Sequence, residues 1–224
     1  MRKIRIASIL LLSILVLIGM SENSFAIIDI TFEGLQDQEP ILDYYNGGFG
    51  GSGSGPGPNY GIAFSGDSLA IVSGTEGGAG NFSSSPTMPT IAFFLNGAGD
   101  VMDVPAGFTT GFSFYYSSPF YSGEVDVYSG LDGTGDLLAS LVLPVTPSEP
   151  GTPECPYGDY CPWVTTGVAF SGTAQSAIFA GVADYIGFDN ITLGSDVPVG
   201  APEPATIILL GFGLAGLATL RKKI

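Results

Sequence analysis

The segment that decides the fold is Phe108-Thr109-Thr110-Gly111-Phe112-Ser113-Phe114-Tyr115-Tyr116, followed after a short gap by Gly123-Glu124-Val125-Asp126-Val127-Tyr128. In an extended chain, successive side chains point to opposite faces of the sheet. Phe112, Phe114 and Tyr116 therefore share one face, and Val125 and Val127 face inward between two outward-facing acids. This period of two, carried by aromatic and β-branched residues, predicts two strands that each place one face in a hydrophobic core.

Short segments of the same kind recur through the body of the chain, and long helical periodicity is missing from it. Gly, Ser, Asp and Pro separate these segments, as turn-forming residues separate strands. The expected strands are residues 27–33, 60–65, 69–73, 90–95, 108–116, 123–128, 137–143, 164–170, 177–180 and 185–193. About ten short strands predict an all-β fold, a single β-sandwich of jelly-roll-like form.

Two segments are predicted to be loops. Residues 46–58 contain seven glycines among thirteen residues, which favours either a long flexible loop or an insertion near a binding edge. Residues 144–162 are rich in proline and contain Cys155 and Cys161, the only cysteines of the chain. An oxidising compartment, if the chain is exported, favours a structural disulfide between them.

The charges are divided between the ends and the body of the chain. The formal net charge is −15, and all six Lys and Arg residues lie within the first five or the last four positions. The sequence has no His, and nineteen of its twenty-one acids lie between residues 27 and 200. A body without cations cannot neutralise phosphates, which argues against nucleic-acid binding. The lack of His also excludes Ser-His-Asp and Cys-His catalysis, and leaves carboxylate chemistry, oxygen-ligated cations or no chemistry.

The N-terminal end reads as a secretory signal peptide, residues 1–26. Arg2, Lys3 and Arg5 form a basic start, residues 6–18 are almost entirely apolar, and Ser24-Phe25-Ala26 offers small residues to signal peptidase. We expect cleavage after Ala26, with an uncleaved membrane anchor as the alternative. The body, residues 27–196, then forms one domain.

The C-terminal end, residues 197–224, combines a short motif, an apolar helix and a basic stop. Pro202-Glu203-Pro204 precedes the apolar residues 205–220, and Arg221, Lys222 and Lys223 follow. At ~1.5 Å per residue the apolar part spans about 24 Å, short of a ~30 Å hydrocarbon core. The basic residues are expected to stay cytoplasmic and leave the domain outside. A plain C-terminal tail anchor is the alternative.

This segment resembles the PEP-CTERM sorting signals that exosortases handle in Gram-negative bacteria. The resemblance rests on Pro202, Glu203 and Pro204, the Gly-rich apolar helix and the Arg-Lys-Lys end. It implies export, transient insertion in the inner membrane and processing by an exosortase-type membrane transpeptidase. Such proteins accompany exopolysaccharide and biofilm matrix, so the resemblance implies a destination at the cell surface or in the extracellular matrix.

A second resemblance concerns acids near the two ends of the domain. The chain reads Phe32-Glu33 near its start and Asp189-Asn190-Ile191 near its end, similar to secreted jelly-roll modules, including MAM-type and carbohydrate-binding domains. In those modules this pairing often holds a calcium ion. The resemblance therefore implies Glu33 and Asp189 as calcium ligands, with Asp29 and Asn190 as weaker additions, although strand-end acids that face water are the alternative.

Two further features have simpler explanations beside their functional ones. Asp132 and Asp136, in Leu131-Asp132-Gly133-Thr134-Gly135-Asp136, echo calcium loops but are explained by a hairpin turn. Among the many aromatic residues, Tyr157, Tyr160 and Trp163 beside the cysteines are the best candidates for carbohydrate contact, with loop packing as the alternative.

The sequence thus predicts a secreted, non-catalytic exoprotein sorted to the envelope or the polysaccharide matrix. The main alternative is a calcium-dependent carbohydrate-binding module. A glycan-active enzyme with paired carboxylates is a weaker alternative, because nineteen acids make some close pair inevitable.

Overall fold

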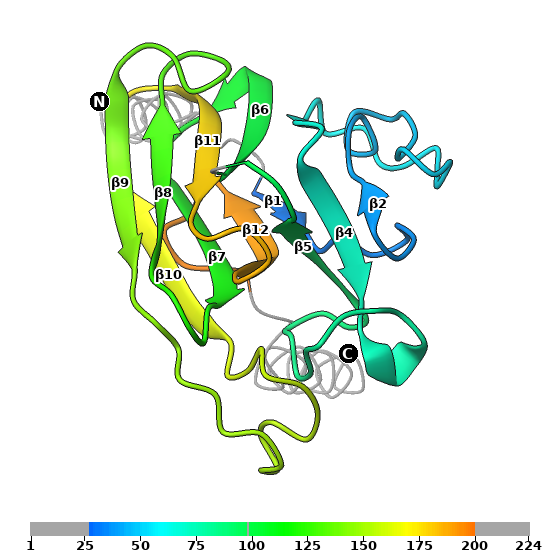
Figure 1. The fold of residues 1–224 in the computed structure, drawn as a ribbon. Helices are drawn as coiled ribbons and strands as arrows, with labels where there is room; N and C mark the ends of the chain where they lie inside the picture. Colours follow the sequence, from blue (N-terminus) through cyan, green and yellow to red (C-terminus); the bar gives the residue numbers. More distant parts are fainter. Residues whose placement is uncertain (1–26, 98, 200–224) are drawn as a thin grey trace, which may run out of the picture.

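The computed structural model describes residues 27–97 and 99–199, and within them the chain is all-β, without an α-helix (Figure 1). Two sheets pack face to face, so the predicted β-sandwich is confirmed. The larger sheet contains β1 (Ile28–Ile30), β2 (Glu39–Pro40), β4 (Ser68–Val72), β5 (Thr90–Phe94), β7 (Gly111–Ser117), β10 (Val164–Ala169) and β12 (Gly187–Leu193). The smaller sheet contains β3 (Ala63–Phe64), β6 (Gly99–Phe108), β8 (Gly123–Tyr128), β9 (Leu137–Leu143) and β11 (Ala174–Ala180).

Strand β12 lies inside the larger sheet, whose order is β10-β7-β12-β5-β4-β2, and it also pairs with β1. One edge of β12 pairs with β7 through residues 187–189 and 192–193, with a shift of register between them. Its other edge pairs with β5 through Gly187 and Phe188, and with β1 through residues 191–193. The first and last strands of the domain are therefore neighbours, which brings residues about 160 positions apart onto one edge.

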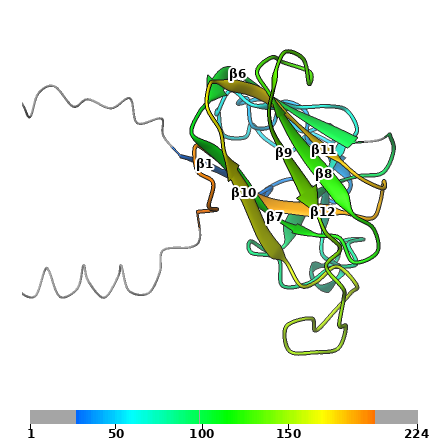
Figure 2. The same cartoon turned by 90° about the vertical axis from the view of Figure 1, so that its left-hand side faces the viewer.

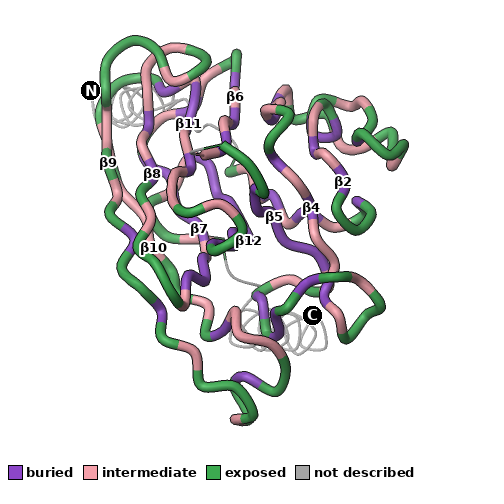
Figure 3. The backbone as a smooth tube through the Cα atoms, viewed as in Figure 1, coloured by how far each residue is buried: buried purple, intermediate pink, exposed green. Residues whose placement is uncertain are grey.

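The core lies between the sheets and is mainly aromatic. Phe112 and Phe114 of β7 are fully buried against Phe179 of β11, with Phe114 and Phe179 ring centroids 5.7 Å apart. Phe188 of β12 packs on Phe179 at 4.9 Å. Figure 3 shows the buried segments along the strands where the sheets face each other. Phe112, Phe114 and Tyr116 of β7 lie in the core, as predicted, and burial alternates along β8. In β7 the other side is also covered, because Ser113 and Ser117 are both buried. Burying each such aromatic ring contributes about 2–3 kcal/mol.

Strand β6 is the main element that the sequence did not predict. Gly99, Pro105 and Gly107 lie in it, and these residues normally interrupt strands. The structure accommodates them with an irregularity, because the pairing of β6 with β11 shifts register between Ala174 and Ser176. Pro105 lies in that shifted part, so its missing N–H interrupts no regular ladder.

The Gly-rich segment 46–58 is a loop, as expected, but a buried carboxylate holds it in place. Glu39 is 0 % exposed, and its Oε1 accepts hydrogen bonds from the backbone N–H groups of Ser52 (2.8 Å) and Ser54 (3.0 Å). Its Oε2 accepts one from Gln36 at 2.7 Å. A Cβ at Gly50 would lie 2.5 Å from Oε1, so glycine is required there for the loop to approach the carboxylate.

Residues 129–136 connect β8 to β9, which pair antiparallel over Gly123–Tyr128. The hairpin explanation of Asp132 and Asp136 is therefore the one the structure shows. Asp132 N donates a hydrogen bond to Asp103 Oδ1 at 2.9 Å, which ties this turn to β6.

Candidate functional site

Two long loops meet over the outer face of the larger sheet. Segment 80–83 and segment 155–163, together called the clip below, are joined by hydrogen bonds from Asp159 N (3.0 Å) and Tyr160 N (3.1 Å) to Asn81 O. Phe82 of the clip is 1 % exposed and covers Ile91 and Phe93 of β5, away from the main core. Figures 1 and 2 show the loop that carries segment 155–163 extending beyond the ends of β9 and β10. The clip thus builds surface structure on a sheet face that would otherwise be open.

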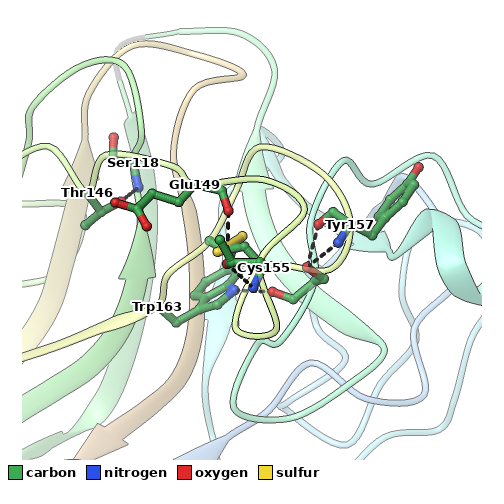
Figure 4. Close-up of a disulfide and its surroundings, with 9 residues drawn as sticks. Ser118, Thr146, Glu149, Cys155, Tyr157 and Trp163 are labelled. Atoms are coloured by element: carbon green, nitrogen blue, oxygen red, sulfur yellow. Dashed lines mark hydrogen bonds between the residues drawn. A yellow bond between two sulfur atoms is a disulfide. The ribbon is translucent and has the colours of Figure 1, made fainter.

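A disulfide between Cys155 and Cys161 closes the loop of the clip, as the sequence predicts. Both cysteines are buried, and their Cα atoms lie 5.6 Å apart. Figure 4 shows Trp163 beside this disulfide and the ring of Tyr157 directed away from it. Trp163 Nε1 donates a hydrogen bond to Ser83 O at 3.0 Å, which fixes the indole in the clip.

A pocket of about 770 Å³ opens on one side of the clip and is called the acidic pocket below. Its carboxylates are Asp29 of β1 and Glu154 of the cysteine loop, and its aromatic walls are Trp163 and Tyr115 of β7. It is also lined by Ser84, Pro86, Thr87, Pro162, Asn190 and Val199. This volume is within the range of small-molecule sites.

A second pocket, of about 340 Å³, lies on the other side of the clip and is called the aromatic pocket below. Phe120, Tyr160 and Tyr185 line it, with Phe120 and Tyr185 ring centroids 5.9 Å apart. Phe120 is 51 % exposed and Tyr185 38 %, while the Tyr160 hydroxyl donates a 2.6 Å hydrogen bond to Asp184 O. Asn81 and Asp159 add polar groups to the lining of this pocket. They hold each other in place, because Asn81 Nδ2 donates a hydrogen bond to Asp159 Oδ2 at 2.9 Å. The pocket therefore combines exposed rings with oriented polar groups.

Glu33 and Asp189, the residues implied as calcium ligands, meet at a shared segment of backbone. Thr87 N donates to Asp189 Oδ2 and Thr90 N donates to Glu33 Oε1, each at 3.0 Å. Asn190 N donates to Asp189 Oδ1 at 2.8 Å. The pairing of β1 with β12 brings these two acids together, because Glu33 follows β1 and Asp189 lies in β12.

Asp29 and Asn190 extend this group of acids toward the acidic pocket. Asn190 Nδ2 donates to Asp29 Oδ2 at 3.3 Å, and Thr192 Oγ1 donates to Asp29 Oδ1 at 3.4 Å. Asn190 Oδ1 accepts from Thr87 Oγ1 at 2.9 Å. Asn190 has a φ of +46°, which asparagine tolerates better than most residues and which interrupts the pairing of β12 with β7.

Burial dominates the electrostatics of these acids. It raises the pKa of Asp189 to about 8; the hydrogen bonds from Thr87 and Asn190 oppose the shift, and the negative charges of Glu33 and Asp29 add to it. Burial also raises the pKa of Asp29, against the hydrogen bonds from Thr192 and Asn190. The pKa of Glu33 is raised by burial as well, against the hydrogen bond from Thr90. No Lys, Arg or His lies between residues 6 and 220 to offset this charge.

The donor chemistry of this group suits calcium, but its side chains alone do not complete a site. Calcium prefers six to eight oxygen ligands. Glu33 and Asp189 supply carboxylate oxygens, and the buried Tyr45 hydroxyl lies close enough to feel the charge of both. Among residues 27–97 and 99–199, no group of three or more His, Cys, Asp or Glu residues is placed to hold a metal. A calcium ion here would need main-chain carbonyl oxygens as well.

The three aromatic residues expected to contact carbohydrate occupy different places. Tyr160 lines the aromatic pocket and Trp163 lines the acidic pocket. Tyr157 is 42 % exposed, and its hydroxyl lies against Gly74, where a Cβ would collide with it. Phe120, Tyr185 and Tyr115 complete the two pockets, yet no local pattern marks them, because the sheets bring them together from distant segments.

The expected signal peptide, Pro202, Glu203 and Pro204, the helix 205–220 and Arg221, Lys222 and Lys223 all lie outside the described residues. Between residues 27 and 199, apart from position 98, no helix is long and apolar enough to cross a membrane.

Comparison with protein-family models places a PEP-CTERM protein-sorting motif at residues 201–223. The motif implies export and membrane-anchored processing by an exosortase. No curated protein gives a significant match.

Solved structures with similar folds are β-sandwich domains. The K2 cleaved adhesin domain of Lys-gingipain from Porphyromonas gingivalis has a TM-score of 0.47 and 14 % identity, covering 76 % of this chain and 100 % of that domain. A β-1,3-glucan-binding module of Bacillus halodurans has a TM-score of 0.35 and 14 % identity, covering 77 % and 97 %. A carbohydrate-binding module of Cellvibrio mixtus lichenase 5A, in complex with cellotriose, has a TM-score of 0.33 and 13 % identity, covering 58 % and 87 %.

Proposed function

We propose that this chain is a non-catalytic exoprotein of a Gram-negative bacterium that an exosortase delivers to the cell surface or the extracellular matrix, where its β-sandwich binds polysaccharide. The observation that carries the sorting role is the PEP-CTERM motif at residues 201–223. Export through a signal peptide agrees with the disulfide between Cys155 and Cys161, since disulfides persist in oxidising compartments.

Polysaccharide binding is supported by the aromatic pocket. Sugar rings present C–H groups that stack on aromatic faces, and their hydroxyls need fixed polar partners. Phe120 and Tyr185 offer exposed rings, and the Asn81–Asp159 pair offers an amide and a carboxylate. The described residues carry no cation, so they repel anionic polymers, and a neutral polysaccharide is the ligand we propose for this pocket.

We also propose that calcium stabilises the domain at Glu33 and Asp189. A divalent ion there would compensate the charge of one buried carboxylate, Asp189, and one half-buried carboxylate, Glu33, that have no cationic side chain of residues 6–220 near them. The ion would hold β1 and the end of β12 together, and with them the floor of the acidic pocket, which includes Asp29 and Asn190. Its role is structural, and the aromatic pocket would depend on it only through the fold.

The sorting role is tested in an exosortase-bearing host by replacing Pro202, Glu203 and Pro204 with alanine. We expect the variant to accumulate in the inner membrane, while wild type and the control Pro198→Ala reach the surface or the medium. Surface delivery of the triple variant at the wild-type level would contradict the proposal.

The binding role is tested by pull-down of the full chain with neutral hexose polysaccharides. Phe120→Ala and Tyr185→Ala are expected to reduce retention at least tenfold, while Phe49→Ala, which removes an exposed ring outside the pocket, leaves it unchanged. Equal retention of all three variants would remove the aromatic pocket as the site. Release of sugar that is lost on Asp159→Asn would instead indicate an enzyme.

A further inference from the structure

The acidic pocket differs from the aromatic pocket in its size and in the share of aromatic rings in its lining. It carries two carboxylates, Asp29 and Glu154, and two aromatic side chains, Trp163 and Tyr115, around about 770 Å³. The aromatic pocket is less than half as large and has more rings in its lining, together with two aspartates, Asp159 and Asp184, of which Asp159 accepts a hydrogen bond from Asn81 Nδ2. A ligand for the acidic pocket therefore has to satisfy negative charge as well as stack on a ring.

The carboxylate of Asp29 is held in a fixed position at the floor of this pocket. Asn190 and Thr192 each donate a hydrogen bond to it, and Thr87 in turn holds the Asn190 side chain. The half-buried Asp29 also lies within the field of Asp189, whose pKa its charge raises. The carboxylate at this floor attracts a positively charged ligand group, because residues 6–220 contain no Lys, Arg or His that could neutralise it.

The wall of the pocket is also rigid. Trp163 is fixed through its Nε1 hydrogen bond to Ser83 O and by edge-on contact with Phe82, with ring centroids 6.1 Å apart. Glu154 directly precedes Cys155, whose disulfide to Cys161 anchors the chain next to it. An ammonium group near an aromatic face gains cation–π attraction, and it also forms charge-assisted hydrogen bonds with carboxylates.

From this combination we infer that the acidic pocket binds an amino-sugar residue with a free, protonated amine, as in a deacetylated hexosamine polymer. The ring of the sugar lies against Trp163 or Tyr115, and its ammonium group lies between Asp29 and Glu154. A sugar ring fills a broad pocket with aromatic walls better than the thin methylene chain of a lysine does, which favours a polysaccharide over a peptide. The inference extends the proposed glycan-binding role, but it uses other residues and another ligand class.

The inference is tested by calorimetric titration of the full chain, purified in detergent, with two probes. These are the fully deacetylated glucosamine tetrasaccharide and its fully N-acetylated counterpart. We expect the deacetylated probe to bind at least tenfold more tightly, and to lose affinity as salt or pH is raised, because salt screens the carboxylates and high pH removes the ammonium proton. Equal affinity for the two probes, or tighter binding of a lysine-containing tetrapeptide, would overturn the inference.

Matched variants locate the binding. Glu154→Gln removes an exposed charge from the pocket, and Glu149→Gln removes the same charge from the same loop outside it. We expect Glu154→Gln and Asp29→Asn each to lower the affinity for the deacetylated probe about tenfold. We expect Glu149→Gln to leave this affinity unchanged. If Glu154→Gln binds the probe like wild type while it unfolds normally, the pocket is not the site.

The two proposals fail separately. Phe120→Ala is expected to lose neutral polysaccharide and keep the deacetylated probe, because Phe120 does not line the acidic pocket. Glu154→Gln is expected to lose affinity for the deacetylated probe and to keep binding neutral polysaccharide. Loss of both ligands in both variants would show that the pockets are not independent and would contradict the assignment of a separate amino-sugar site.

Discussion

Asp189→Asn is the substitution that best tests the electrostatics of the site. Burial raises the pKa of Asp189 to about 8, whereas an unfolded chain leaves an aspartate near 3.9. At a pH between these two pKa values, the folded state keeps a proton on Asp189 that the unfolded state has lost. The contribution of Asp189 to the stability of the metal-free protein is therefore largest below the unfolded pKa and declines as pH rises toward the folded pKa.

The expected slope is about 1.4 kcal/mol per pH unit for one proton. From about pH 5 to about pH 7 the wild type should lose about 3 kcal/mol of unfolding free energy in a chelator. For a domain of this size that corresponds to a Tm lower by about 5–10 °C. Asp29 and Glu33 also have raised pKa values, so they add to the slope in the same direction.

The assay is thermal and urea unfolding at several pH values, in chelator and in excess calcium. Asp189→Asn should lose most of the slope in chelator, whereas Glu76→Gln, which removes an exposed acid, should keep it. Calcium should raise the Tm of wild type most at neutral pH, because the ion keeps Asp189 ionised. A wild type with no pH slope, or an Asp189→Asn variant with the full slope, would refute the reasoning. An unchanged Tm in excess calcium would remove the calcium site.

Three further predictions concern the segments around the site. Glu39→Gln should destabilise the domain by about 2–3 kcal/mol in urea, because the amide keeps only one acceptor oxygen and turns its NH2 group toward either Gln36 N–H or the N–H groups of Ser52 and Ser54; an unchanged midpoint would show that stability does not depend on the second carboxylate oxygen. Cys155→Ser should lower the unfolding free energy by about 2 kcal/mol, because the disulfide no longer closes the loop; in reductant, wild type and the variant should have the same stability. Gly187→Ala should cost about 1–3 kcal/mol, because its Cβ would lie 2.8 Å from Ile91 Cδ1 and 3.1 Å from Trp163 Cη2; unaltered fluorescence of Trp163, the only tryptophan, would count against this contact.

The pH response has a second component with the opposite sign. Burial would raise the pKa of Glu39, but hydrogen bonds from Ser54, Gln36 and Ser52 outweigh it and lower that pKa below its usual range. The stability that Glu39 contributes is present above the unfolded value and is lost as pH falls through the folded one. It therefore acts at more acidic pH than the transition assigned to Asp189.

The sequence by itself determined the fold class, the disulfide and the C-terminal sorting motif. The period-two pattern of β7 and β8 identified the side chains that face the core, since burying large apolar side chains dominates the energy of these strands. It did not reveal that the outer side of β7 is covered as well. The sorting motif was also readable, because residues 201–223 form one continuous signal. The disulfide followed from there being only two cysteines in an exported chain.

Only the tertiary structure decided the composition of the pockets. Asp29 and Asn190 are 161 positions apart and become hydrogen-bond partners only because β1 pairs with β12. The two pockets likewise depend on the clip, which joins segments about 80 positions apart through backbone N–H and C=O groups. Backbone hydrogen bonds are available to nearly every residue and leave no mark in the sequence. Periodicity therefore predicts which face of a strand is buried, while the partner across a sheet or loop is set by how the whole chain closes its core.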